Sequence, residues 1–188
     1  MFSGIVEKKA EIISIENGLF TIKEDTKELS MGQSIAHDGA CMTLCEIGVD
    51  FYKFFAMEET LKRTNFGTKK VGDSFNVEKS VRYGDRMDGH FVTGHIDTTG
   101  EVYKIDKKED NSKVVYIKFP CEFKNLLVEK GSIAVNGVSL TLVEVGDDFF
   151  SISLIPYTLD ITNLGELVIG SIVNLEFDIL GKYVNKRG

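Results

Sequence analysis

The chain has 188 residues, of which 43% are hydrophobic and 27% are charged, and this composition is ordinary for a soluble globular protein. Its net charge of −7 argues against a nucleic-acid-binding surface, which is normally basic. The sequence shows no secretory leader and no run of about 20 apolar residues that would predict a membrane span. Three cysteines without a CxxC pair indicate reduced thiols, and hence a cytoplasmic protein.

The predicted elements are mostly short β-strands separated by turns such as DG, NG and GD. The clearest strands, in chain order, are residues 18–24, 51–57, 112–119 and 148–155. Helix is sparse: residues 59–65 and 157–163 predict one or two turns each, and residues 121–130 are the best helical candidate. Strands spaced by roughly 8–12 residues are typical of a small sandwich or barrel.

One unit of sequence occurs twice. A shift of 98 positions aligns residues 34–78 with residues 132–176 without a gap, and 18 of these 45 positions are identical. Upstream, a shift of 90 aligns residues 2–12 with residues 92–102, and the difference between the shifts falls in a charged loop of the second copy, where an insertion is tolerated. Two copies favour two similar domains over a solenoid or propeller.

We expect these domains to span residues 1–89 and 90–188. The fold class is all-β, with each copy closed into a six-stranded Greek-key barrel and little helix. A small barrel has room for one small ligand at its mouth. The duplication therefore predicts two equivalent ligand sites in one chain.

Reactive side chains distinguish the two copies. Cys41 in the first copy corresponds to Ser139 in the second, and His95 in the second copy corresponds to Ile5 in the first. An arbitrary cysteine is more often a small buried hydrophobe, and a lone histidine is more often structural. However, imidazole titrates near neutrality and suits proton transfer. The histidines and cysteines lack the spacing of zinc ligands, so no metal is expected.

Six segments resemble riboflavin synthase of the alpha-chain type, in the order and spacing of that family: MFSGIVE, GACMTL, GHFVTGHID, NGVSLTL, SLIPYTL and VNLEFDILGKY. The resemblance covers nearly the whole chain, and it implies two tandem lumazine-binding barrels. It also implies a transferase of riboflavin biosynthesis. Two molecules of 6,7-dimethyl-8-ribityllumazine exchange a four-carbon unit and give riboflavin and 5-amino-6-(D-ribitylamino)uracil, without a cofactor or metal.

The resemblance implies the residues of the site as well. The catalytic candidates are Cys41, His95, Ser139, Thr141 and Asp178. Cys41 would assist at the electrophilic C7 of the acceptor lumazine, and His95 would take a proton from the C7 methyl group of the donor. Asp178 would bind ribityl hydroxyls or orient the histidine. The substrate-binding candidates are Gly4, Ile5, Val6, Cys41, Met42, Thr43, Phe55, Ala56, Met57, Glu58, Glu59, Thr60, Gly94, His95, Ile96, Lys130, Ser139, Leu140, Thr141, Leu154, Ile155, Pro156, Tyr157 and Thr158.

Other polar residues receive structural interpretations. We interpret His37 as a turn residue, Cys45 as a core residue and His90 as a structural or interface residue. Asn136 stands where many relatives have aspartate, and an amide keeps the ability to form a turn but loses the charge.

The rival function is a non-catalytic lumazine or flavin carrier. The antenna proteins of luminous bacteria resemble this family and lack its long carboxyl-terminal helix, and this sequence ends at Gly188, ten residues after Asp178. Such carriers typically lose the histidine of the GHI motif, whereas this chain keeps His95, which favours the enzyme. A flavin-reductase-like barrel is disfavoured because the chain has no GxGxxG motif and no basic patch.

The resemblance also implies partners. The small-molecule partner is 6,7-dimethyl-8-ribityllumazine, and neither nucleic acid nor membrane is expected. Family members are homo-oligomers, usually homotrimers, and the reacting pair lies between the amino-terminal barrel of one subunit and the carboxyl-terminal barrel of the next. Whether a lumazine synthase is a further partner stays open.

Overall fold

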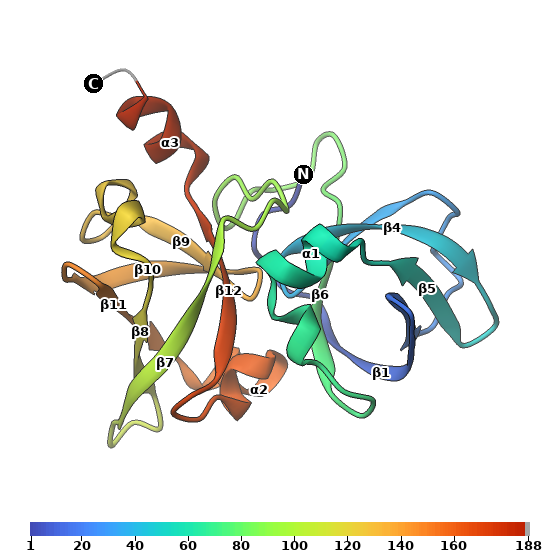
Figure 1. Ribbon diagram of the computed structural model, residues 1–188, viewed down its shortest axis with the longest axis horizontal. Helices are drawn as coiled ribbons and strands as arrows, with labels where there is room; N and C mark the ends of the chain where they lie inside the picture. The colour runs from blue at the N-terminus through green and yellow to red at the C-terminus, as the bar shows by residue number, and fades with distance from the viewer. Residues whose placement is uncertain (187–188) are drawn as a thin grey trace.

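The computed structural model describes residues 1–186 and consists of two antiparallel barrels that lie side by side (Figure 1). The first barrel contains β1 (Lys8–Glu16), β2 (Leu19–Lys23), β3 (Ser34–His37), β4 (Ala40–Ile47), β5 (Phe51–Phe55) and β6 (Ser74–Lys79). The second contains β7 (Thr98–Lys107), β8 (Lys113–Lys118), β9 (Ser132–Val135), β10 (Val138–Val145), β11 (Phe149–Leu154) and β12 (Ile172–Phe177). The prediction of two six-stranded barrels is confirmed.

The two barrels share one topology. The strands follow the closed order β1-β2-β5-β4-β3-β6 in the first barrel and β10-β11-β8-β7-β12-β9 in the second, which is the same cycle after a shift of six strands. The predicted domain boundary between residues 89 and 90 falls in the connection from β6 to β7, and its position stays a prediction.

Helical segments are few and short among the described residues. They are α1 (Glu58–Arg63), the 3₁₀ helix η1 (Asn65–Thr68), the 3₁₀ helix η2 (Cys121–Leu126), α2 (Pro156–Ile161), the 3₁₀ helix η3 (Asn163–Glu166) and α3 (Ile179–Asn185). The short helices expected near residues 59–65 and 157–163 are confirmed. No described helix has the length and apolar character needed to cross a membrane.

The helix expected at residues 121–130 is shorter and tighter than predicted. It forms only the 3₁₀ helix η2, which ends at Leu126. Phe123 and Leu126 pack against the core of the second barrel. Residues three apart lie on one face of a 3₁₀ helix, so this geometry directs both side chains to the core.

The core of the first barrel is aromatic and contains a histidine. Phe20, Phe54 and Phe75 are fully buried there, and the ring of His37 lies 4.2 Å from that of Phe54. His37 is the last residue of β3 and is itself fully buried, so its interpretation as a turn residue is wrong. Its Nε2 lies 2.7 Å from the hydroxyl of Tyr52. Burial lowers the pKa of His37 to about 3 and raises the pKa of Tyr52.

Cys45 does not belong to this core. Met42 and Leu44 of β4 are buried, whereas Cys45 is exposed at an irregularity in the pairing of β4 with β5. Side chains two apart share a face of a strand, so Cys45 lies on the outer face of β4 with Cys41 and Thr43. The interpretation of Cys45 as a core residue is therefore wrong.

The barrels exchange the short segments that precede their first strands. Phe2 and Val92 pair in an antiparallel bridge where the two segments cross. Beyond the crossing, Val6 packs into the core of the second barrel, and Ile96 packs against the core of the first. Each barrel is thus completed by residues that the repeat assigns to the other copy.

A polar seam also joins the barrels. It consists of Asp38, Asn65, Lys69, Asn76, Asn136, Asn163 and Asn174. The backbone N–H of Asn65 donates to Asn174 Oδ1 over 2.6 Å, and the N–H of Asn163 donates to Asn76 Oδ1 over 2.7 Å. Since these bonds are related by the repeat, each barrel satisfies the same buried donor of its neighbour.

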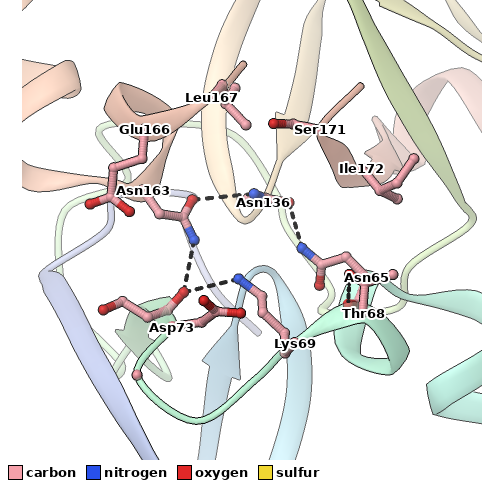
Figure 2. A pocket seen from close by; sticks show the side chains of 12 residues that line it. Asn65, Thr68, Lys69, Asp73, Asn136, Asn163, Glu166, Leu167, Ser171 and Ile172 are labelled. Carbon is pink, nitrogen blue, oxygen red and sulfur yellow. Dashed lines mark hydrogen bonds between the residues drawn. The ribbon is translucent and has the colours of Figure 1, made fainter. Parts of the chain in front are cut away.

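The seam opens to solvent at a groove of about 390 Å³ (Figure 2). The amides of Asn65, Asn136 and Asn163 face one another along it, and Lys69 points in from the opposite wall. The groove contains none of the predicted site residues. Asn136 belongs to this contact between barrels, where its Oδ1 accepts from Asn65 Nδ2 and its backbone carbonyl accepts from Asn76 Nδ2.

Candidate functional site

Two of the predicted reactive side chains lie in one small cavity beside β4. Cys41, which is half-buried, and His95, which is exposed, both line this cavity of about 190 Å³. Thr60 and Glu59 of α1 line it as well. We call this cavity the Cys41 site. The arrangement places a thiol and an imidazole within reach of one bound molecule.

Glycine at position 94 allows the exchanged segment to reach the Cys41 site. The backbone N–H of Cys41 donates to Gly94 O over 2.9 Å. Gly94 has a φ of 85°, and a Cβ added to it would lie 2.5 Å from the Cβ of Cys41. Only glycine fits this close approach with a positive φ. The contact carries His95, the next residue in the chain, to the Cys41 site beside β4.

The second barrel repeats this arrangement with other side chains. The backbone N–H of Ser139 donates to Gly4 O over 2.8 Å. Gly4 has a φ of 77°, and a Cβ on it would lie 2.6 Å from the Cβ of Ser139. Ile5, which is 47% exposed, takes the place that His95 has in the other barrel. We call Gly4, Ile5 and Ser139 the Ser139 site.

His90 distinguishes the Ser139 site further. Its Nδ1 lies 2.7 Å from Ser139 Oγ, and its Nε2 is buried without a hydrogen-bond partner among the described residues. Burial lowers the pKa of His90, and the nearby carboxylate of Asp178 opposes this shift. Asp178 also begins α3, because its Oδ1 accepts from the backbone N–H of Leu180 over 2.9 Å. The structure thus brings Asp178 near His90.

Two predicted threonines lie on the outer faces of the barrels. Thr43 and Thr141 are exposed, each two residues beyond the reactive position of its strand. Because side chains two apart share a face of a strand, Thr43 follows Cys41 and Thr141 follows Ser139 on the same surface. Lys130 is exposed in the turn before β9, and its N–H donates to Leu142 O.

The other predicted binding residues divide between core and surface. Val6, Met42, Ala56 and Leu154 are buried, so their side chains fill the barrels. Leu140 and Thr158 are half-buried. Those that are exposed at or next to the ends of β5 and β11 are Phe55, Met57, Glu58, Ile155, Pro156 and Tyr157. A ligand held there contacts mainly the exposed members and backbone atoms of the rest.

Three residues of the Cys41 site escaped the sequence analysis. Ala40, Arg63 and Thr64 line the cavity. Helical spacing was the available signal for Arg63, because it lies four residues after Glu59 on the same face of α1 and forms an ion pair with it. The exchange of segments had no signal in the repeat, because the alignment shows which residues of the two copies are equivalent and not which ones are in contact.

Comparison with known proteins identifies the architecture. The family described as lumazine binding domain matches twice, at residues 3–80 and 93–178. Riboflavin synthase of Actinobacillus pleuropneumoniae is 39% identical over 192 residues, covering 99% of this chain and 89% of the relative. Riboflavin synthase of Escherichia coli strain K12 is 38% identical over 185 residues, covering 95% of this chain and 87% of the relative.

Solved structures of LumP are also similar. LumP complexed with 6,7-dimethyl-8-(1'-D-ribityl) lumazine has a TM-score of 0.84 and 29% identity, over 94% of this chain and 98% of that chain. LumP complexed with riboflavin has a TM-score of 0.87 and 28% identity, over 94% of this chain and 99% of that chain. The likeness therefore extends through both barrels.

Proposed function

The chain belongs to the riboflavin synthase family of tandem lumazine-binding domains, and from this premise we propose that it is a riboflavin synthase. It converts two molecules of 6,7-dimethyl-8-ribityllumazine into riboflavin and 5-amino-6-(D-ribitylamino)uracil by transfer of four carbons. The observation that carries the proposal is that Cys41 and His95 line one cavity, whereas the equivalent Ser139 site has Ser139 and Ile5 at these positions. Two bound copies of one compound then meet unequal reactive groups.

At the Cys41 site, the proposed chemistry is removal of a proton and addition to carbon. The exposed imidazole of His95 acts as the general base toward the acidic C7 methyl group of a lumazine. The methyl group that loses this proton belongs to the donor lumazine, and the thiol of Cys41 acts at the electrophilic C7 of the acceptor, as a nucleophile or by positioning one. Since both side chains line the same cavity, we propose that the donor methyl group and the acceptor C7 meet there. The second lumazine approaches from another mouth.

At the Ser139 site, hydroxyl groups and a histidine hold the other lumazine. His90 is predominantly neutral near neutral pH because burial lowers its pKa, and a neutral imidazole can accept the proton of the Ser139 hydroxyl. That contact fixes the direction of the Ser139 oxygen toward its neighbours. Thr141 on the same strand face adds a second hydroxyl, and Asp178 acts through His90.

The exposed apolar residues around the mouths support an oligomer in which one subunit covers the sites of another. Phe55 and Met57 are 53% and 64% exposed, and Ile155 and Tyr157 are 56% and 68% exposed. Apolar side chains gathered in this way favour a protein interface. We include in the proposal a homotrimer with its active site between subunits. The three free thiols support a cytoplasmic location.

The test is turnover of one compound by the pure protein. Incubation with 6,7-dimethyl-8-ribityllumazine alone should produce flavin fluorescence together with an equal amount of the pyrimidine product. The His95→Ala variant should lower kcat by about 100- to 10,000-fold, the range that a general base contributes. Retention of fluorescent ligand without turnover would contradict the proposal and support the alternative function, a non-catalytic lumazine or flavin carrier.

A further inference from the structure

A buried carboxylate holds the segment that carries His95. Glu176 of β12 is 2% exposed, and it accepts three hydrogen bonds from two successive residues. Its Oε1 accepts from the N–H of Thr93 over 2.6 Å and from Thr93 Oγ1 over 2.7 Å, and its Oε2 accepts from the N–H of Gly94 over 2.9 Å. Both oxygens are therefore engaged immediately before His95.

A second anchor lies directly after His95. Asp97 Oδ2 accepts from the N–H of Phe177 over 2.9 Å and pairs with Lys182 Nζ over 2.7 Å. The N–H of His95 donates weakly to Thr93 Oγ1 over 3.3 Å, so the hydroxyl bound by Glu176 also contacts His95 itself. His95 thus lies between two points fixed to the end of β12 and to α3, while it lines the Cys41 site of the first barrel.

In the first copy, an equivalent buried carboxylate holds the segment that reaches the Ser139 site. Glu78 of β6 is 5% exposed and accepts from the N–H of Ser3 over 2.6 Å, from Ser3 Oγ over 2.8 Å and from the N–H of Gly4 over 3.0 Å. The carbonyl oxygen of Gly4 in turn accepts a hydrogen bond from the N–H of Ser139. Each barrel therefore fixes a segment that completes the site of the other barrel.

We propose that Glu176 is the positioning residue for His95, so that the second barrel sets the geometry of the Cys41 site. Glu78 does the same for Gly4 and Ile5 at the Ser139 site. The inference rests on the proposed function for its kinetic consequence, whereas the placement of the segment against Cys41 does not depend on that function. A charged acceptor suits this task, since hydrogen bonds to a carboxylate are shorter and stronger than those between neutral groups.

The experiment compares Glu176→Gln with Glu78→Gln in the full chain. Glutamine keeps the shape but turns a donor toward the Gly94 N–H, which releases the segment. We expect Glu176→Gln to lower kcat by about 10- to 100-fold with little change in KM, because small displacements of a catalytic group have effects of this order. Alkylation of Cys41 by iodoacetamide, located by mass spectrometry, should change in rate by at least about 3-fold, since Gly94 then no longer shields it.

Glu78→Gln is the matched control. It removes an equivalent buried anchor, so it reports general loosening, yet it should leave Cys41 alkylation within about 2-fold of the wild type because its segment lies at the Ser139 site. Equal changes of Cys41 reactivity in the two variants, or no change in Glu176→Gln, would overturn the inference. Since alkylation needs no turnover, a failed synthase assay with the expected alkylation pattern would refute only the proposed function.

A second pair of variants guards against misfolding. Thr93→Val removes the hydroxyl that joins Glu176 to His95 but leaves Glu176 in place. Thr93→Ser keeps the hydroxyl, and the first copy already has Ser3 at this position. The proposal expects Thr93→Val to reproduce the loss in kcat and the change in Cys41 alkylation, and Thr93→Ser to restore both. An equal effect of the two substitutions would contradict it.

Discussion

The first barrel keeps polar groups at positions where the second barrel is apolar or neutral, and it does so in pairs. His37 and Tyr52 contact each other inside the first barrel, and the repeat places Val135 and Phe150 at the same positions. A valine or phenylalanine alone would leave the other member of the polar pair buried without a partner. The comparison shows that the second copy replaces both members of the pair, so that neither His37 Nε2 nor the Tyr52 hydroxyl has to lose its partner.

The seam between the barrels follows the same rule. Asp38 is fully buried and pairs with Lys69 over 2.8 Å, whereas the corresponding residues of the second copy are Asn136 and Leu167. A carboxylate in a buried position needs a cation, and an amide does not. The aspartate and the lysine therefore form one unit, and the second copy replaces both of them together.

The largest expected effect comes from breaking the Asp38–Lys69 unit. Lys69→Leu should lower the free energy of unfolding by about 3–5 kcal/mol, because it leaves a buried carboxylate without its counter-ion. The double variant Asp38→Asn with Lys69→Leu copies the second half of the seam and should recover most of this loss. Chemical denaturation of the wild type, both single variants and the double variant measures the coupling. A tolerated Lys69→Leu would show that the seam does not require the charge pair.

A smaller effect is expected from pH acting on the His37–Tyr52 pair. The pKa of His37 is about 3 in the folded barrel and about 6.5 when unfolded, so both states are neutral above pH 6.5. As the pH falls below 6.5, only the unfolded state gains a proton, and stability is lost until the folded pKa is reached. The contribution is of the order of 1.4 kcal/mol per pH unit, or about 2 kcal/mol by pH 5.

The variant that tests this effect is again taken from the second barrel. His37→Val with Tyr52→Phe removes the titrating group and its partner together, in the manner of Val135 and Phe150. Unfolding free energies at pH 7.5 and pH 5 should differ less in the double variant than in the wild type by about 2 kcal/mol. The buried carboxylates Glu78 and Glu176 titrate in both proteins and cancel. An unchanged pH dependence would place the titration elsewhere.

The repeat predicted the barrels well because strands, turns and alternation are local properties of each copy. It also identified Cys41 and His95 as unequal partners of Ser139 and Ile5. It could not bring Cys41 and His95 into one site, because that contact depends on segments crossing at Phe2 and Val92.

Burial of single polar residues was equally hard to predict. The DG turn after His37 favoured a turn position for the histidine. Its side chain is instead fully buried in the barrel and contacts the hydroxyl of Tyr52, 15 residues away in the sequence. Cys45 shares the outer face of β4 with Cys41 and Thr43, so the period of the strand was the available signal for its exposure. For His37 the deciding contact comes from a neighbouring strand, which no local pattern records.

The smallest effect on stability is expected at the reactive positions, where the comparison between barrels is most specific. Cys41→Ser should change the free energy of unfolding by less than about 1 kcal/mol, because Cys41 is only half-buried and serine already occupies the equivalent position. The rate of flavin formation should fall, since a serine hydroxyl is a weaker nucleophile than a thiol at neutral pH.

The exchange variant, which adds Ser139→Cys to Cys41→Ser, tests whether the thiol can act from the other site. It should not recover the rate, because the second mouth offers Ile5 in place of His95 and His90 loses the Ser139 hydroxyl. A recovered rate in the exchange variant would mean that the thiol acts without the imidazole. A loss of more than about 2 kcal/mol in the unfolding free energy of Cys41→Ser would make Cys41 a core residue instead.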